Sequence, residues 1–234
     1  KRALISVTNK DGVVDFAKGL VELGFEIVST GGTMKVLQEN GVSCIAIDDV
    51  TGFPEMLDGR VKTLHPMVHG GLLYRRDLPS HVETIKKHGI HPIDLVCVNL
   101  YEFEKALKAG KDLPDMIENI DIGGPSMIRS AAKNFKDVLI VTDPKDYDNV
   151  LDAIKNDTTD FDFRMNLAYK AFSMTGAFLG LILTGLSISM TSLIGLIMLV
   201  GIVVNNAIVL IDYTNILRRE QGMPARDALI FSGK

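Results

Sequence analysis

The sequence predicts an α/β domain, a parallel sheet with helices on both faces, followed by an α-helical hairpin of the transmembrane type. As far as residue 172, short apolar runs alternate with segments of helical periodicity, which is the pattern of parallel strands joined by crossover helices. After that point, Ala171 to Ile211 contains no Asp, Glu, Lys, Arg or His in 41 residues. A spanning helix needs about 20 apolar residues, so this run has room for two spans.

The first part of the chain alternates strands and helices in order. Apolar runs mark the strands, and apolar residues at a spacing of three and four mark the helices, the first of which Asp11 is placed to cap. The predicted elements are a strand over 3–7, a helix over 13–23, a strand over 26–30, a Gly31-Gly32 turn into a helix over 33–40, and a strand over 44–47.

A long polar segment over 49–80 follows, and a loop of that length inside a domain is usually functional. Beyond it the alternation continues. The predicted elements are strands over 94–100 and 138–142, a helix over 124–134 entered through a Gly123-Gly124 turn, and helices over 147–155 and 163–172.

Charge and composition exclude several classes of function. Through Lys170 there are 21 Lys and Arg against 26 Asp and Glu, so no basic surface for nucleic acid is predicted. Aromatic residues are few and are not interleaved with basic ones, so no stacking surface for single strands is expected either. Cys44 and Cys97 are far apart and without a CxxC spacing, which favours reduced buried thiols over a disulfide framework or a zinc site.

Ligands of open α/β sheets bind outside the carboxyl ends of the strands, so the residues that follow the strands should converge. The segment STGGT at 29–33 places glycines and hydroxyls between a strand and a helix, where backbone N–H groups and the helix dipole favour a phosphate. A plain strand-to-helix turn explains this motif about as well by itself. Lys10, just after the first strand, favours the phosphate interpretation.

Two further motifs carry ionisable groups. The loop DGRVKTLHP at 58–66 holds basic residues and a histidine, for which solvated loop charges are the alternative. The segment IDIGGPSMIRSAAKN at 120–134 supplies Asp121, a Gly-Gly turn, and a helix on which Arg129 and Lys133 share one face. A carboxylate, two lysines and a tyrosine near one anion site would form a general acid/base and oxyanion-stabilising set.

His65 and His69 have the spacing of a metal pair if their segment is helical. Pro66 and the pair Gly70-Gly71 argue against a helix there, and a metal site would need a third ligand nearby. We therefore favour structural hydrogen bonds for both histidines and predict no metal site.

Several of these motifs together resemble the amino-terminal, IMP cyclohydrolase domain of the bifunctional purine-biosynthesis (PurH) family. They are SVTNKDG, STGGT, DGRVKTLHPMVHGGLL, NLYEFE, ENIDIGGPSMIRSAAKN and LAYKAFSMTGA, and the resemblance extends over 1–177. It implies a methylglyoxal-synthase-like fold in a cytoplasmic enzyme, a hydrolase acting on cyclic amidines. The implied reaction closes formyl-AICAR, a purine nucleotide precursor, to inosine monophosphate with loss of water, the last step of de novo purine biosynthesis. No cofactor is implied, and a homodimer is compatible with the family.

The same resemblance implies the site residues. The catalytic set is Lys62, Tyr101, Asp121 and Lys133, in which Asp121 orients or deprotonates the carboxamide, Lys62 and Tyr101 support the formyl oxygen, and Lys133 shuttles the proton. The nucleotide-binding set is Thr8, Asn9, Lys10, Thr30, Gly31, Gly32, Thr33, Arg60, Val61, Thr63, Val98, Asn99 and Ile122. The alternatives are a methylglyoxal synthase or a nucleotide- or phosphate-binding module of the same fold, against which KTLHP and DIGGP argue.

The apolar tail divides at Ser187–Ser192 into a short segment over 172–186 and an adequate span over 193–211. Lys170 precedes the pair and three arginines follow it, which leaves both ends in the cytosol. Residues 177–234 resemble a transmembrane hairpin of resistance-nodulation-division (RND) efflux transporters. Asn205 and Asn206 would face a bundle interior, but an intramembrane Asp or Lys of a proton relay is missing, so we predict no transport activity.

The two resemblances meet at Gly176-Ala177 without a linker, which gives two domains, 1–176 and 177–234. We favour an accidental chimera in which the transformylase half of the enzyme is absent. The alternatives are an enzyme anchored in the inner membrane by a genuine tail, and a transporter fragment that carries a passive soluble domain. We expect the exposed tail to cause aggregation that detergent reverses.

Overall fold

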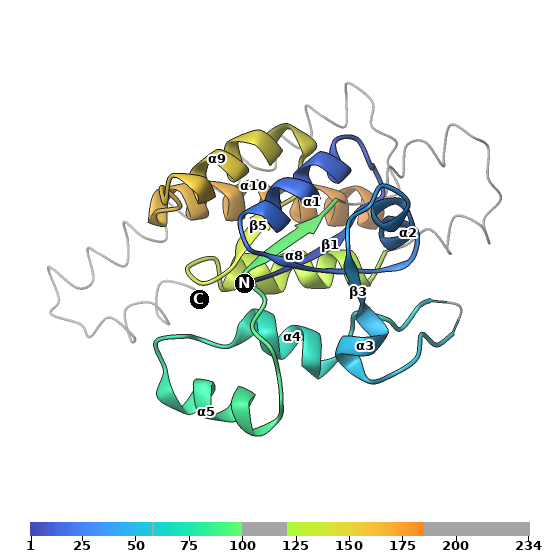
Figure 1. The fold of residues 1–234 in the computed structure, drawn as a ribbon, viewed down its shortest axis with the longest axis vertical. Helices are drawn as coiled ribbons and strands as arrows, with labels where there is room; N and C mark the ends of the chain where they lie inside the picture. Colours follow the sequence, from blue (N-terminus) through green and yellow to red (C-terminus); the bar gives the residue numbers. More distant parts are fainter. Residues whose placement is uncertain (58, 100–120, 185–234) are drawn as a thin grey trace, which may run out of the picture. The chain divides into compact units, whose positions relative to one another are not determined.

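The computed structural model describes residues 1–57, 59–99 and 121–184, with the backbone alone from 174 to 184. Within these residues five parallel strands form one sheet in the order β3-β2-β1-β4-β5 (Figure 1). The strands are Arg2–Ser6 (β1), Glu26–Ser29 (β2), Cys44–Ala46 (β3), Leu95–Val98 (β4) and Leu139–Val141 (β5). The chain leaves β1 toward β2 on one side and later adds β4 on the other. The strand order therefore reverses between β1 and β4, and ligands of such sheets bind outside the carboxyl ends of the strands at this point.

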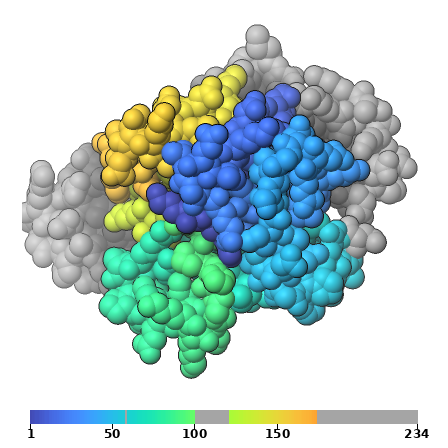
Figure 2. All heavy atoms as spheres, in the orientation of Figure 1, coloured from blue at the N-terminus to red at the C-terminus, as the bar shows by residue number. Residues whose placement is uncertain are grey.

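Helices cover both faces of the sheet, as predicted. They are Val13–Glu22 (α1), Gly31–Glu39 (α2), Ile47–Thr51 (α3), Pro66–Leu73 (α4), Pro79–Lys87 (α5), Gly123–Lys133 (α8), Tyr147–Lys155 (α9) and Phe161–Thr184 (α10), with a 3₁₀ turn at Pro144–Asp146. Crossovers between parallel strands are right-handed, so helices that follow strands on opposite sides of β1 lie on opposite faces. Accordingly α1 packs with α2 and α9, whereas α8 packs on β4, β5 and α4. Figure 2 shows the residues of α5 projecting from one end of this domain.

The core is centred on β1 and β4. Ala3, Leu4 and Ile5 of β1 are fully buried, and all four residues of β4 are buried. Strands covered on both faces are apolar along their whole length, which is why these runs could be recognised. Both cysteines are free thiols, and Cys97 is buried where its Sγ lies 3.4 Å from the Tyr147 hydroxyl. Burial raises the pKa of the Cys97 thiol to about 12.

Two local predictions were wrong. Asp11 does not cap α1, because the chain enters that helix through Gly12 at φ 68° and no side chain caps it. The segment Pro66–Leu73 is helical, because Pro66 occupies the first helical position, where its missing N–H is not needed. Gly71 is required there by close packing, since a Cβ would lie 2.5 Å from the carbonyl oxygen of His91. The polar segment 49–80 is therefore partly helical.

The chain divides into two units, Lys1–Gly176 and Ala177–Lys234. Helix α10 spans 24 residues and includes most of the first predicted apolar segment. Among the residues that the structure describes, no helix is both long and apolar enough to cross a membrane. The second predicted span over 193–211, with Asn205 and Asn206, lies outside the described residues, so the transmembrane hairpin stays a prediction.

Candidate active site

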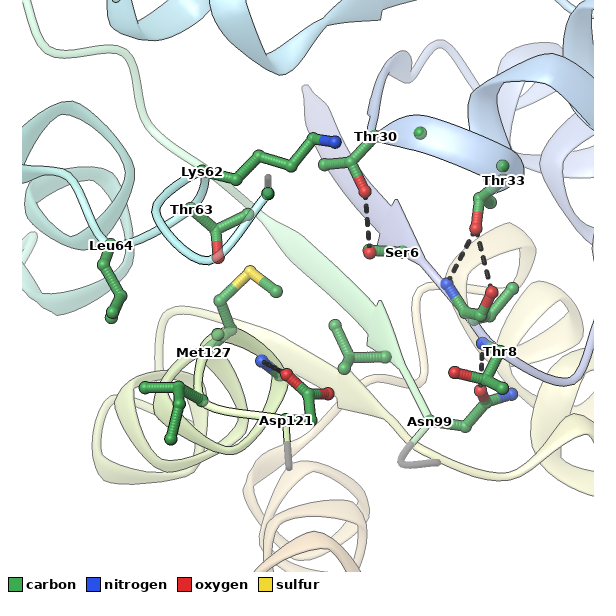
Figure 3. Close-up of a pocket in the computed structure, with 18 of the residues that line it drawn as sticks. Ser6, Thr8, Thr30, Thr33, Lys62, Thr63, Leu64, Asn99, Asp121 and Met127 are labelled. Atoms are coloured by element: carbon green, nitrogen blue, oxygen red, sulfur yellow. Dashed lines mark hydrogen bonds between the residues drawn. The ribbon is translucent and has the colours of Figure 1, made fainter. Parts of the chain in front are cut away.

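A cavity of about 720 Å³ opens at the carboxyl ends of β1, β2 and β4, where the topology places ligands (Figure 3). Most of the predicted site residues line it. They are Thr8, Lys10, Thr30, Gly31, Gly32, Thr33, Arg60, Lys62, Thr63, Val98, Asn99, Asp121 and Ile122. The cavity thus brings together segments that are more than a hundred residues apart in the chain.

Thr33 ties the first turn of α2 to the end of β1. Its hydroxyl accepts a hydrogen bond from the Val7 N–H at 3.0 Å and donates one to the Val7 carbonyl oxygen at 2.9 Å. The hydroxyl groups of Ser6 and Thr30 lie 2.9 Å apart beside this link. Since Thr33 and Val7 are buried, these bonds fix the amino-terminal end of α2 relative to the sheet.

Asn99 holds the loop after β1 in a similar way. Its side-chain oxygen accepts hydrogen bonds from the Thr8 and Asn9 N–H groups at 2.6 and 3.1 Å, and its amide donates to the Asn9 carbonyl at 2.9 Å. Asn9 itself does not line the cavity, and its side chain accepts a hydrogen bond from the Asp11 N–H at 2.9 Å. Asn99 and Asn9 therefore build the loop that presents Lys10.

Two lysines flank the amino-terminal end of α2. A Cβ placed on Gly31 would lie 3.4 Å from Lys62 Nζ, and one placed on Gly32 would lie 4.0 Å from Lys10 Cε. Gly31 also has a φ of +43°, a conformation that favours glycine. A helix terminus with positive partial charge, next to two ammonium groups, favours an anion with several oxygens such as a phosphate.

Asp121 lies on another wall of the cavity, just before α8. One carboxylate oxygen accepts a hydrogen bond from the Gly124 N–H at 2.9 Å. A Cβ on Gly124 would lie 2.3 Å from the other carboxylate oxygen, so glycine is needed for this approach. Burial raises the pKa of the Asp121 carboxyl above its ordinary value, an effect that the N–H groups of Gly124 and Gly123 oppose only in part. A raised pKa makes this carboxylate a stronger proton acceptor.

The cavity is also lined by residues that the predicted site set did not include. They are Ser6, Val7, Glu55, Gly59, Leu64, Gly123, Gly124 and Met127. Glu55 forms an ion pair with Lys62, and Met127 and Leu64 supply apolar surface. All of these lining residues except Glu55 lie within motifs recognised in the sequence, which was a usable signal, whereas nothing in the sequence distinguishes Glu55 from other charged loop residues.

Like Asn9, two further predicted residues lie outside the cavity. Val61 makes backbone hydrogen bonds of 3.3 Å in both directions with Met56, which closes a small loop beside the cavity. Lys133 is exposed at the carboxyl end of α8 and lines a separate depression with Arg129 and Tyr169. Tyr101 lies outside the described residues, so its role stays a prediction.

Both histidines of the 65–69 pair make hydrogen bonds within the domain. His65 precedes α4 and its Nδ1 accepts from the Met67 N–H at 3.2 Å. His69 Nδ1 lies 3.0 Å from the Ser130 hydroxyl and joins α4 to α8, while burial lowers the pKa of its imidazole. Across the described part of the chain, no three His, Cys, Asp or Glu residues are grouped closely enough to hold a metal ion.

Most of this chain is similar in sequence to known proteins. The bifunctional purine biosynthesis protein PurH of Clostridioides difficile (strain 630) is 63% identical over 182 residues, which are 78% of this chain and 36% of that relative. PurH of Limosilactobacillus reuteri (strain DSM 20016) is 61% identical over 184 residues, with the same coverage. The solved structure of ForH is 36% identical, with a TM-score of 0.69 over 76% of this chain and 93% of that one. This chain is therefore similar to PurH over most of its own length. It spans about a third of the length of its PurH relatives.

Two family models match different parts of the chain. The MGS-like domain matches residues 12–126, within the PurH-type domain, in agreement with the fold that the sequence predicted. The AcrB/AcrD/AcrF family matches residues 170–234, of which most lie outside the described residues. The relationship to PurH thus rests on the first unit, and the similarity to transporters rests on the tail.

Proposed function

We propose that the PurH-type domain catalyses the cyclohydrolase reaction, the closure of formyl-AICAR to inosine monophosphate. The observation that carries the proposal is one cavity with two chemically distinct ends. The amino-terminal end of α2, with Lys10 and Lys62, suits the 5′-phosphate of a nucleotide. Asp121, whose carboxyl pKa is raised by burial, supplies a proton acceptor on another wall. The kinship with PurH supports the same assignment.

The reaction requires one bond to form and one water to leave. The carboxamide nitrogen attacks the formyl carbon, Asp121 takes the proton that this nitrogen releases, and the formyl oxygen becomes an alkoxide that must be stabilised and protonated. The resulting hydroxyl then leaves as water with the proton of the formamide nitrogen, and a carbon–nitrogen double bond completes the ring. Lys62 and Tyr101 are assigned to the formyl oxygen, and rigid placement of the folded substrate lowers the entropic part of the barrier.

A direct assay tests this function. The full chain, kept in solution with a mild detergent, is mixed with formyl-AICAR and the purine absorbance is followed. We expect turnover by the wild type, and a loss of at least about 100-fold in Asp121→Asn, since general-base catalysis contributes about 10²–10⁴-fold. Asp152→Asn removes the same charge from the exposed surface of α9 and should retain activity.

A folded sample that gives no signal would refute the proposal. If such a sample binds inosine monophosphate without turnover, the domain is a nucleotide-binding module of the MGS-like fold instead. Folding is checked by a cooperative thermal transition, so an unfolded preparation cannot be mistaken for an inactive enzyme.

For the tail we propose an RND-type helical segment, 177–234, joined to the enzyme at Gly176-Ala177 by a chimeric event. The match of residues 170–234 to the AcrB/AcrD/AcrF family supports a foreign origin. Genomic DNA read across codons 170–185 tests the join. A single uninterrupted transcript, with the protein in the inner-membrane fraction, would show instead that the tail is a membrane anchor and would refute the chimera.

A further inference from the structure

Glu55 places a carboxylate inside a cavity that is otherwise suited to anions. The loop that carries it is closed by the backbone hydrogen bonds between Met56 and Val61. One oxygen of Glu55 forms the ion pair with Lys62 Nζ. The other faces Gly59, where a Cβ would lie only 2.7 Å away and where φ is +89°. The loop is thus folded closely around this carboxylate, which holds it against the lysine.

The ion pair determines where Lys62 points. Its ammonium lies beside Gly31, at the amino-terminal end of α2. Figure 3 shows Lys62 directed toward Thr30, with Asp121 on a different side of the cavity next to Met127. In this arrangement the positive charge of Lys62 is neutralised by the protein itself, at the position where a ligand phosphate would need it.

We propose that Glu55 is a positioning residue for Lys62, and that an anionic ligand must displace its carboxylate to reach the Lys62 ammonium. The inference rests on the proposed function in that the anion is taken to be the phosphate of a nucleotide. Glu55 competes with the ligand for Lys62, because its carboxylate pairs with the Lys62 ammonium and repels a second anion nearby. Upon displacement, the Lys62 ammonium is no longer neutralised by Glu55 and is available to the substrate.

The size of the effect follows from the exposure of the pair. The side chains of Lys62 and Glu55 are 20% and 41% exposed, so solvent screens their attraction. Pairs of this kind contribute about 0.2–1 kcal/mol, which corresponds to a factor of up to about five in a dissociation constant. Removing the charge of Glu55 should therefore strengthen the binding of a phosphate by about twofold to fivefold.

The test measures the dissociation constant of inorganic phosphate by calorimetry, using the full chain in mild detergent at low ionic strength. Glu55→Gln should bind phosphate about twofold to fivefold more tightly than the wild type, while Glu55→Asp, which keeps the charge, should stay closer to it. Glu39→Gln is the matched control, because Glu39 pairs with Lys35 at 4.0 Å on the exposed surface of α2 and its removal changes the net charge equally. That control should leave the phosphate affinity unchanged.

Inosine, which lacks the phosphate, separates this effect from a general change in the cavity, and its affinity should be the same in Glu55→Gln and the wild type. Phosphate binding that is unchanged or weakened in a folded Glu55→Gln variant overturns the inference.

The role of Glu55 and the cyclohydrolase function can be refuted independently. Turnover of formyl-AICAR without a change in phosphate affinity refutes only the role of Glu55, whereas the affinity change without turnover refutes only the cyclohydrolase function.

Discussion

The hydroxyl of Thr33 offers a sharp test of how the phosphate end of the cavity is built. Thr33→Val keeps the shape of the side chain and removes both hydrogen bonds to Val7, whose backbone is buried. A buried polar group left without its partner costs about 1–3 kcal/mol, so we expect the free energy of unfolding to fall by about 2 kcal/mol. In a domain of this size that is a decrease of about 4–8 °C in the melting temperature.

The melting temperature of the first unit, followed by circular dichroism on the full chain in mild detergent, measures this effect. Thr84→Val is the matched control, because the Thr84 hydroxyl donates to the Ser80 carbonyl at 2.7 Å on the exposed surface of α5, where water can replace it. We expect that control to melt within about 2 °C of the wild type, since surface substitutions change stability by about 0.5 kcal/mol or less. If Thr33→Val also melts within this margin, the link between α2 and β1 does not hold the site together.

Three further substitutions test the reacting end of the cavity. Asp121→Asn should lower turnover by at least about 100-fold yet raise the melting temperature at neutral pH. The raised carboxyl pKa of Asp121 means that ionisation favours the unfolded chain, so the wild type loses stability as pH rises through the raised pKa. The difference in melting temperature between the variant and the wild type should vanish in acid, below the pKa of this carboxyl in the unfolded chain, because the wild-type carboxyl is then neutral as well. A difference that persists in acid would show that ionisation of Asp121 is not its cause. Gly124→Ala should lower kcat by about 100-fold, because a Cβ 2.3 Å from the carboxylate oxygen must displace Asp121, and a misplacement of about 1 Å costs about that much; an unchanged kcat refutes the close approach. If Lys133 acts in the cavity of a second copy of the chain, Lys62→Ala and Lys133→Ala should each be inactive alone, and a mixture of the two should recover activity. Full activity of Lys133→Ala alone would exclude Lys133 from the reaction.

The fold could be predicted from the sequence because its central strands are buried on both faces. A run such as Leu95–Val98 must be apolar along its whole length, which leaves a clear signal. Helix α4 was missed because Pro66 and its glycines usually break helices. Here the proline occupies the one helical position that tolerates it, and Gly71 serves the packing against His91. Such compensation depends on three-dimensional neighbours that the local sequence does not contain.

The residues of the candidate site likewise fall into those that the sequence could predict and those that it could not. The residues that follow strands, such as Thr33 and Asn99, could be placed together because the carboxyl ends of parallel strands meet at one edge. Glu55 could not be predicted, since its importance depends on the Met56–Val61 hydrogen bonds that turn it back toward Lys62. Its charge is ordinary for a loop, and only the fold shows that it enters the cavity.

Lys133 shows how a helix limits the use of a sequence motif. The resemblance to PurH places Lys133 and Asp121 in one catalytic set, and the two are only twelve residues apart. Helix α8 begins at Gly123, beside Asp121, and its 11 residues rise by about 1.5 Å each, so Lys133 lies about 15 Å further along the axis. The side chain of Lys133 is much shorter than this distance, and Lys133 does not line the cavity. Within one domain, the length of helix α8 therefore keeps Lys133 and Asp121 apart. If both act in one reaction, they must come from two copies of the chain, which is the arrangement that activity in a mixture of Lys62→Ala and Lys133→Ala would reveal.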